Sequence, residues 1–387
     1  MRKIKVAFID YVLEPDKPGK SGLSDLVWDM ASELVNQGHE AHIIASYYTH
    51  QYPDDRVIVH NFPTPPIGYR NIIGQLWILK RAEAIAKRIK PDIIHAPEYI
   101  STAIFAVLGS RAPLVLTVPG NVYQRLSAGQ PDEGLYFMFL KWAARVSARH
   151  CAKIIAISSE MKHWWEWTGS DPRKTPFIPL GVNNHLFHFV PDAKKILGLS
   201  DDKFVFLYTG RFSIEKGLLD VIEAVNQIKL EARQSSLKII FIGSGGLLPK
   251  MESEIAGKNI GDFFEIKSWI SKEDLSTWYS AADALLLPSY AEGLSRTILE
   301  AMICGTPVIG SRITGTEDMV IEGVNGYLFT PHHVNEIGSI LKKIIQKDID
   351  LHSLRPATLD YAQNNLTWPI IVNRIINEVY LPILDRK

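Results

Sequence analysis

The stretch SYAEGLSRTILEAMICGTPVIGS, residues 289–311, decides the fold class. It follows the apolar run ALLLP and is typical of a strand end, a short loop, a helix and the next strand. Parallel strands covered on both faces have such continuous apolar runs. Two acids stand out, because Glu292 lies in the loop and Glu300 lies in the early turns of the helix. Ligands of open α/β sheets bind near the carboxyl ends of strands, where these acids are expected.

The same alternation of strand and helix runs through most of the chain. Strand candidates in the first half are KVAFI, EAHIIAS, PDIIHA, APLVLTV and AKIIAIS, and in the second half FVFLYTG, LKIIFIG, ALLLPS and TPVIGS. The pattern restarts after the irregular stretch TPFIPLGVNNHLFHFVPD. We therefore predict two Rossmann-like domains, with domain boundaries at 1–175, 176–192 (the linker), 193–360 and 361–387 (a C-terminal helix).

The composition narrows the class of protein. The 387 residues include 42 Lys and Arg against 42 Asp and Glu, so a general nucleic-acid binder, which would be basic, is disfavoured. Cys151 and Cys304 have no metal-ligand spacing and favour a reducing compartment. The first apolar run breaks at Asp10, and no run approaches the roughly 18 apolar residues of a membrane span. We expect a cytoplasmic protein.

Two cations follow the predicted strand FVFLYTG. Arg211 and Lys216 flank a helix start at about Gly217. Backbone N–H groups and the helix dipole add to the side-chain charges at such a place, so the spacing fits a site for an anion. Solvated loop cations are the open alternative.

The loop after ALLLPSY could meet the same anion. Gly293 permits a tight turn, Ser295 fits an N-cap, and the amides of Leu294 and Ser295 would point at the ligand. A carboxylate such as Glu300 can accept from two adjacent hydroxyls, as a ribose offers, with roughly 1.5–3 kcal/mol per bond. Taken alone, Glu300 is better explained as a helix-terminal acid and Glu292 as a solvated loop acid.

Together these segments resemble the retaining nucleotide-sugar transferases of glycosyltransferase family 4. The resemblance is carried in family order by YTGRFSIEKGLLDVIEA, IIFIGSGGLL, STWYSAADALLLPSYAEGLSRTILEAMICGTPVIGS and GTEDMVIEGVNGYLF, and more loosely by SGLSDLVWDMASELVNQGHEAHIIA, PDIIHAPEY, PLVLTVPGN and IIAISSEMK. It implies an α/β GT-B fold, in which two Rossmann-like domains face each other across a central cleft. The terminal WPIIVNRIINEVY resembles the helix that crosses back to the N-terminal domain in that family.

The resemblance also implies roles for single residues. Arg211 and Lys216 would hold the donor diphosphate and stabilise the departing nucleotide, and Glu292 would contact the transferred sugar; these three form the catalytic set. Glu300 would bind the ribose. The implied donor-binding set is Gly22, Arg211, Lys216, Glu292, Gly293, Leu294, Ser295 and Glu300.

The chain departs from the family at TVPGN, where Pro119 replaces a histidine that contacts the donor sugar in many members. His95 and Asn121 are the candidates to supply those contacts on the acceptor side, and a buried, satisfied histidine is the alternative for His95. The tripeptide DID at 348–350 imitates a metal motif, but it follows a Lys-rich helix end and is interpreted as solvated. We expect no cofactor and no required metal ion.

The expected reaction is transfer from a nucleoside-diphosphate sugar, UDP-linked as in many family members (UDP-glucose, for example), to a glycan or lipid-linked saccharide in cell-surface polysaccharide synthesis. The segment RNIIGQLWILKRAEAIAKRIK, residues 70–90, could dock peripherally on the inner membrane face, or be an ordinary surface helix. The alternative functions are a non-catalytic sugar-nucleotide-binding protein and a nucleotide-sugar epimerase on the same fold.

Overall fold

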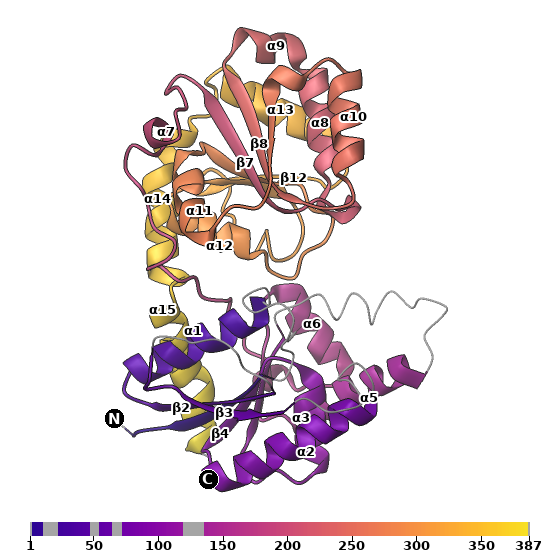
Figure 1. The fold of residues 1–387 in the computed structure, drawn as a ribbon, viewed down its shortest axis with the longest axis vertical. Helices are drawn as coiled ribbons and strands as arrows, with labels where there is room; N and C mark the ends of the chain where they lie inside the picture. Colours follow the sequence, from indigo (N-terminus) through magenta and orange to yellow (C-terminus); the bar gives the residue numbers. More distant parts are fainter. Residues whose placement is uncertain (1, 11–21, 47–53, 64–71, 119–134, 386–387) are drawn as a thin grey trace. The chain divides into compact units, whose positions relative to one another are not determined.

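The chain folds into two units, each built on its own sheet (Figure 1). The computed structural model describes residues 2–10, 22–46, 54–63, 72–118 and 135–385. The first unit comprises Met1–Leu180 and Trp368–Lys387, and the second comprises Gly181–Thr367.

The first unit contains a parallel six-stranded sheet in the order β3-β2-β1-β4-β5-β6, the order of the Rossmann fold. Its strands are β1 (Lys5–Asp10), β2 (Glu40–Ser46), β3 (Ile58–Phe62), β4 (Ile93–Ala96), β5 (Leu114–Thr117) and β6 (Lys153–Ile155). Its helices are α1 (Gly22–Asn36), α2 (Ile72–Ile89), α3 (Tyr99–Val107), α5 (Leu135–His150), α6 (Ser159–Thr168), η1 (Pro172–Lys174), α15 (Trp368–Arg374), the π-helical η4 (Ile375–Tyr380) and α16 (Leu381–Leu384). The C-terminal α15 packs on α1, and α3 packs on both α2 and α5.

The second unit repeats this topology with the order β12-β11-β10-β7-β8-β9, again parallel. Its strands are β7 (Phe204–Arg211), β8 (Leu237–Ser244), β9 (Phe264–Lys267), β10 (Ala284–Leu287), β11 (Val308–Ser311) and β12 (Gly326–Phe329). Its helices are α7 (Ala193–Ile196), η2 (Ile214–Lys216), α8 (Leu218–Gln227), α9 (Lys229–Gln234), α10 (Leu248–Gly257), η3 (Gly261–Phe263), α11 (Lys272–Ala281), α12 (Arg296–Ile303), α13 (Val334–Ile345) and α14 (Leu351–Asn365).

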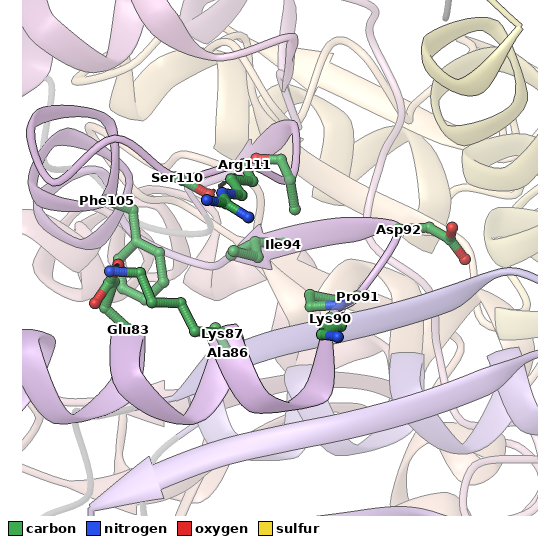
Figure 2. Close-up of a pocket in the computed structure, with 11 residues that line it drawn as sticks. Glu83, Ala86, Lys87, Lys90, Pro91, Asp92, Ile94, Phe105, Ser110 and Arg111 are labelled. Carbon is green, nitrogen blue, oxygen red and sulfur yellow. Dashed lines mark hydrogen bonds and ion pairs between the residues drawn. The ribbon is translucent and has the colours of Figure 1, made fainter.

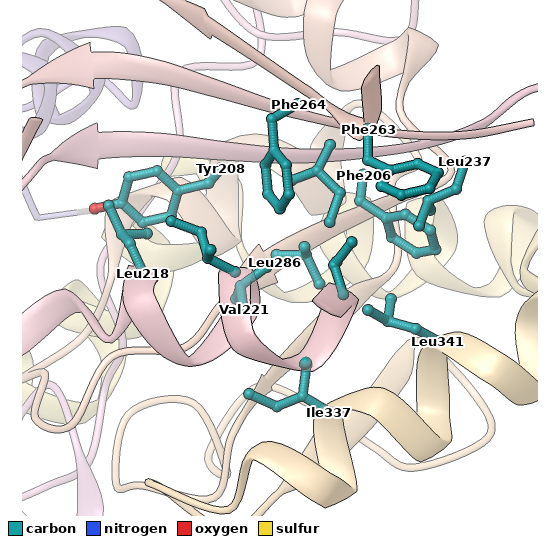
Figure 3. Close-up of a cluster of buried hydrophobic side chains, with 14 of the residues drawn as sticks. Phe206, Tyr208, Leu218, Val221, Leu237, Phe263, Phe264, Leu286, Ile337 and Leu341 are labelled. Atoms are coloured by element: carbon teal, nitrogen blue, oxygen red, sulfur yellow. The ribbon is translucent and has the colours of Figure 1, made fainter. Parts of the chain in front are cut away.

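One core cluster of the second unit lies between its sheet and the helices α8, α10 and α13 (Figure 3). Helix α8 buries Leu218, Val221, Ile222 and Val225, whose spacing places them on one helical face. They meet Phe206 of β7 and other buried strand side chains. Burying one such side chain stabilises the fold by about 1.5–3 kcal/mol. This packing fixes where β7 ends and where α8 begins, and so positions the loop between them.

All nine predicted strands are present, and the sheets contain three more, β3, β9 and β12. Each of the three lies at an edge of its sheet. Strand β3 has only one buried residue, Phe62, and β9 likewise only Phe264, so neither has the continuous apolar run that marks a central strand.

The border between the units falls at Leu180 and Gly181, inside the segment 176–192 that we assigned to the linker. The C-terminal segment of the first unit begins at Trp368, later than the predicted residue 361. The reason is helix α14, which runs to Asn365 and packs on α12 of the second unit.

Candidate active site

The loops after β7 and β10 meet because these strands are parallel neighbours, so that their carboxyl ends lie at one edge of the sheet. The N–H of Tyr290 donates to the carbonyl of Glu215 at 2.9 Å. Gly217, the N-cap of α8, has a φ of 64°, and a Cβ there would lie 2.0 Å from the carbonyl oxygen of Pro288. Only glycine allows the two loops to approach this closely.

Lys216 and Glu292 form an ion pair within this loop cluster. The Nζ of Lys216 lies 2.5 Å from Oε1 of Glu292, and only 16% and 12% of the two side chains are exposed. The hydroxyl of Ser289 donates to the same carboxylate oxygen at 2.8 Å. Glu292 is therefore not a solvated loop acid. The pair places side by side a cation predicted to hold the donor diphosphate and an anion predicted to contact the transferred sugar.

Arg211 is the last residue of β7, and 75% of its side chain is exposed. Its guanidinium lies 3.9 Å from Glu215, and such exposed pairs contribute little to stability. The hydroxyl of Tyr208 donates to the carbonyl of Arg211 at 2.8 Å and so fixes the backbone from which the side chain projects. The guanidinium lies in solvent beside the loop that carries Lys216.

Glu300, on α12, is held by a buried hydrogen-bond chain. The hydroxyl of Tyr279, on α11, donates to Oε2 of Glu300 at 2.9 Å, and lies 2.7 Å from Oγ1 of Thr209 on β7. Tyr279 is fully buried, and burial, followed by the charge of Glu300, raises its pKa well above the ordinary value. Its hydroxyl therefore stays protonated and available as a donor.

Sequence reasoning missed Tyr279 and Thr209. Tyr279 precedes Glu300 by 21 positions and lies in the segment STWYSAADALLLPSY, which carried the family resemblance. That position within the resembling segment was the one indication of a role for Tyr279 in the sequence. The residues next to Glu300 do not indicate a partner on another helix.

The turn from Gly293 to Ser295 leads into α12. Ser295 stands at the N-cap position as predicted, but its hydroxyl pairs with that of Thr297 at 2.8 Å and makes no cap bond to a backbone N–H. Leu294 is buried. A Cβ on Gly315, which has a φ of 85°, would lie 2.2 Å from the carbonyl oxygen of Gly293. A third loop, after β11, therefore closes against this turn.

The predicted residues of the first unit have a different status. His95, on β4, is buried, and its ring nitrogens lie 2.7 Å from the hydroxyl of Tyr380 and 2.8 Å from that of Thr117. Burial lowers the pKa of His95 to about 3. These contacts favour the structural alternative for His95. Gly22 is the first residue of α1, whereas Pro119 and Asn121 lie outside the described residues.

In the part of the chain that the structure describes, no three or more His, Cys, Asp or Glu side chains are grouped so as to hold a metal ion. Asp350 of the DID tripeptide caps α14 instead, because its carboxylate accepts the N–H groups of His352 and Ser353 at 2.9 and 3.3 Å. None of the helices within the described ranges has the length and hydropathy needed to cross a bilayer.

Comparisons with known proteins match both units to one group of enzymes. Residues 20–186 match the model for Glycosyltransferase Family 4, and residues 189–360 match that for Glycosyl transferases group 1. Together the two models cover most of the chain, which is a family 4-like glycosyltransferase. It is thus a transferase, and its two doubly wound sheets form the GT-B fold.

Relatives of this transferase align along most of their length. The D-inositol 3-phosphate glycosyltransferase of Pseudarthrobacter chlorophenolicus is 26% identical, covering 93% of this chain and 91% of that protein. The alpha-D-kanosaminyltransferase of Streptomyces kanamyceticus is 22% identical, covering 83% of this chain and 89% of that protein. Among solved structures, sucrose-phosphate synthase from Thermosynechococcus elongatus superposes with a TM-score of 0.80 at 21% identity over all of both chains. Anabaena HepE in complex with UDP superposes with a TM-score of 0.76 at 20% identity, covering 96% of this chain and 98% of that chain.

Proposed function

We propose that this transferase moves a sugar from a UDP-sugar to a glycan or lipid-linked saccharide, with retention of configuration and without a required metal ion. The observation that carries the proposal is the loop cluster of the second unit, where Lys216, Glu292 and Glu300 are each held by partners from other elements. The choice of nucleotide is supported by HepE, a protein of the same fold whose structures contain UDP and UDP-glucose.

In this proposal the cations meet the donor diphosphate. An ammonium group has three N–H donors, so Lys216 can keep its bond to Glu292 and still bind a phosphate oxygen. Exposed Arg211 supplies the second cation. Glu292 accepts from hydroxyls of the transferred sugar, Glu300 accepts from the ribose, and the amides of residues 294 and 295 meet the phosphate.

The bond changes follow from this placement. The bond from the anomeric carbon to the diphosphate breaks while the acceptor oxygen attacks from the same face, and the acceptor proton passes to a donor phosphate oxygen. Positive charge develops on the sugar and negative charge on the leaving group. Fixed cations at the diphosphate stabilise this separation where it grows. The glutamates bind the donor in this scheme and form no covalent sugar intermediate.

The direct test is calorimetric titration of the protein with UDP-, GDP- and ADP-sugars in the presence of EDTA. Binding of UDP-glucose or another UDP-sugar is expected, and both Lys216→Ala and Glu300→Ala should weaken it severely. Lys250→Ala, at an exposed position on α10, is the matched control and should bind as wild type does. Failure to bind any nucleotide sugar would refute the proposal.

Turnover separates the alternatives. A retaining transferase should transfer the sugar only when an acceptor is present. NMR should then show that the sugar in the product has the same anomeric configuration as in the donor. Product from donor alone would indicate an epimerase. Donor binding with neither transfer nor hydrolysis would indicate a binding protein.

Two helices of the first unit support peripheral contact with an anionic membrane surface. The chain is neutral, yet the exposed charged residues of α2 and α5 are all cations: Lys80, Arg81, Lys87, Arg88, Lys141, Arg145 and Arg149. Glu83 is the single acid of the two helices, and it is paired with Lys87. Large apolar side chains are exposed among them: Ile73, Leu76, Met138 and Trp142. Cations beside apolar side chains are what an anionic lipid surface attracts.

Co-sedimentation with vesicles tests this contact. Binding to phosphatidylglycerol vesicles should exceed binding to phosphatidylcholine, weaken with added salt, and fall in Trp142→Ser. Trp167→Ser removes an equally large and more exposed indole from α6 and should bind as wild type does. Equal binding to both lipids would contradict the proposal.

A further inference from the structure

A cavity of about 500 Å³ lies in the first unit, at the edge of the sheet where β4 and β5 begin. Ligands of this fold bind at the opposite edge, where the strands end. Its apolar wall is formed by the buried side chains of Ala86, Ile94 and Phe105 (Figure 2). The volume and the mixture of apolar and polar walls are those of a small-molecule site.

The two acids at this cavity are already compensated. Glu83 is paired with Lys87 at 2.5 Å. Asp92 accepts the backbone N–H of Lys5 at 2.8 Å and lies 4.0 Å from the guanidinium of Arg2. Figure 2 shows the carboxylate of Asp92 turned away from the other labelled residues. Neither acid therefore neutralises the remaining cations of the lining.

Those remaining cations are Lys90 and Arg111. Both are exposed, and within the described ranges neither side chain has a hydrogen bond or an ion pair to the protein. Figure 2 shows Arg111 beside Ser110, and both cations belong to the lining of the cavity. The cavity thus joins an apolar wall to two cations that lack an internal counter-charge.

The backbone at Lys90 makes a substitution by glycine informative. Lys90 ends α2 with its N–H bonded to the carbonyl of Ala86 at 3.0 Å, and its φ of 51° lies in the left-handed region. Glycine adopts this conformation without strain and is the usual residue after a helix. A lysine is held here against the preference of its backbone, as Lys347 is after α13.

We propose that this cavity binds a small organic phosphate monoester. The phosphate, with nearly two negative charges at neutral pH, would lie between Lys90 and Arg111, and the apolar body would rest on Ile94 and Phe105. A guanidinium suits this role because its N–H groups can bind two phosphate oxygens at once. The site is separate from the loop cluster of the second unit and does not depend on the function proposed for it.

The test is calorimetric titration with phenyl phosphate. Lys90→Gly and Arg111→Gln should each weaken binding at least about tenfold, as loss of a charge-assisted hydrogen bond does. Lys90→Gly should also raise the Tm, because glycine relieves the left-handed backbone, so lost binding cannot be a folding defect. The matched control is Lys347→Gly, a lysine with a φ of 63° in the second unit, which should raise the Tm and leave the Kd unchanged.

Lys216→Ala distinguishes this cavity from the candidate active site. It should leave phenyl phosphate binding intact. Three results would overturn the proposal. Only Lys216→Ala could lose binding, Lys90→Gly and Arg111→Gln could both bind with wild-type affinity, or the wild-type protein could fail to bind phenyl phosphate.

The phosphate could belong to a soluble compound or to a lipid headgroup, and phosphatidic acid vesicles separate these sources. If phenyl phosphate displaces wild-type protein from the vesicles and Lys90→Gly weakens vesicle binding, the site takes a headgroup. If phenyl phosphate still binds through Lys90 while vesicle binding is unchanged, the site takes a soluble phosphate.

Discussion

Replacing Tyr279 by phenylalanine tests whether Glu300 binds the ribose of the UDP-sugar that we propose as the donor. The substitution removes one hydroxyl and keeps the buried ring. Oε2 of Glu300 loses its donor at 2.9 Å, and the hydroxyl of Thr209 loses its partner at 2.7 Å. Glu300 keeps its charge and its place on α12, but its carboxylate loses the hydrogen bond that Tyr279 of α11 donates.

The magnitude follows from the bond that is lost. A hydrogen bond to a charged group contributes roughly 1.5–3 kcal/mol. If Glu300 must be oriented at the moment of binding, the affinity for UDP should fall by a factor of about 10 to 100, since 1.4 kcal/mol corresponds to tenfold. The effect should be confined to the ribose contact, so the turnover number at saturating donor should change much less than KM.

Calorimetry with UDP and 3′-deoxy-UDP measures this effect. Wild type should prefer UDP, and Tyr279→Phe should lose most of that preference. The matched control is Tyr290→Phe, which removes a hydroxyl that donates to Asp220 at 3.0 Å and should leave the preference unchanged. If Tyr279→Phe weakens both ligands equally, or neither, Tyr279 does not orient Glu300 toward a ribose.

Three further outcomes are expected. Gly217→Ala should lower the free energy of unfolding by about 2 kcal/mol or more, because its Cβ would lie 2.0 Å from the carbonyl oxygen of Pro288 at a left-handed φ; unchanged urea unfolding would contradict this contact. A double-mutant cycle of Lys216→Met and Glu292→Gln should give a coupling energy of about 0.5–3 kcal/mol in urea unfolding, and additive effects would show that the ion pair does not form in solution. The pKa of His95 is about 3 in the folded chain, whereas its ordinary value is 6.5. Between these values the unfolded chain binds a proton at His95 and the folded chain does not. The free energy of unfolding should therefore fall by about 2 kcal/mol between pH 6.5 and 5. The His95→Gln variant should lack this decrease in the free energy of unfolding. If the variant and the wild type show the same pH dependence, His95 is not the group responsible.

Much of the fold was predictable because its signals are local. Continuous apolar runs mark buried parallel strands wherever they occur, so the central strands of both sheets were found from the sequence. The loop residues after β7 and β10 could also be placed at strand ends, because the carboxyl end of a strand is a position that the sequence reveals; their roles stay predictions. Edge strands such as β3 and β9 were not predicted, because a strand with few buried residues has no continuous apolar run.

The sequence by itself determined which chemical groups are available and near which strand ends they lie. Only the tertiary structure decided which of them meet. Lys216 and Glu292 are 76 positions apart and pair because β7 and β10 are neighbours in the sheet. Glu300 accepts a hydrogen bond from Tyr279 of α11, and His95, on β4, is paired with Tyr380 of the C-terminal segment. Spacing along a chain reports local conformation, whereas sheet order and helix packing result from burial of the whole apolar surface, and these bring distant side chains together.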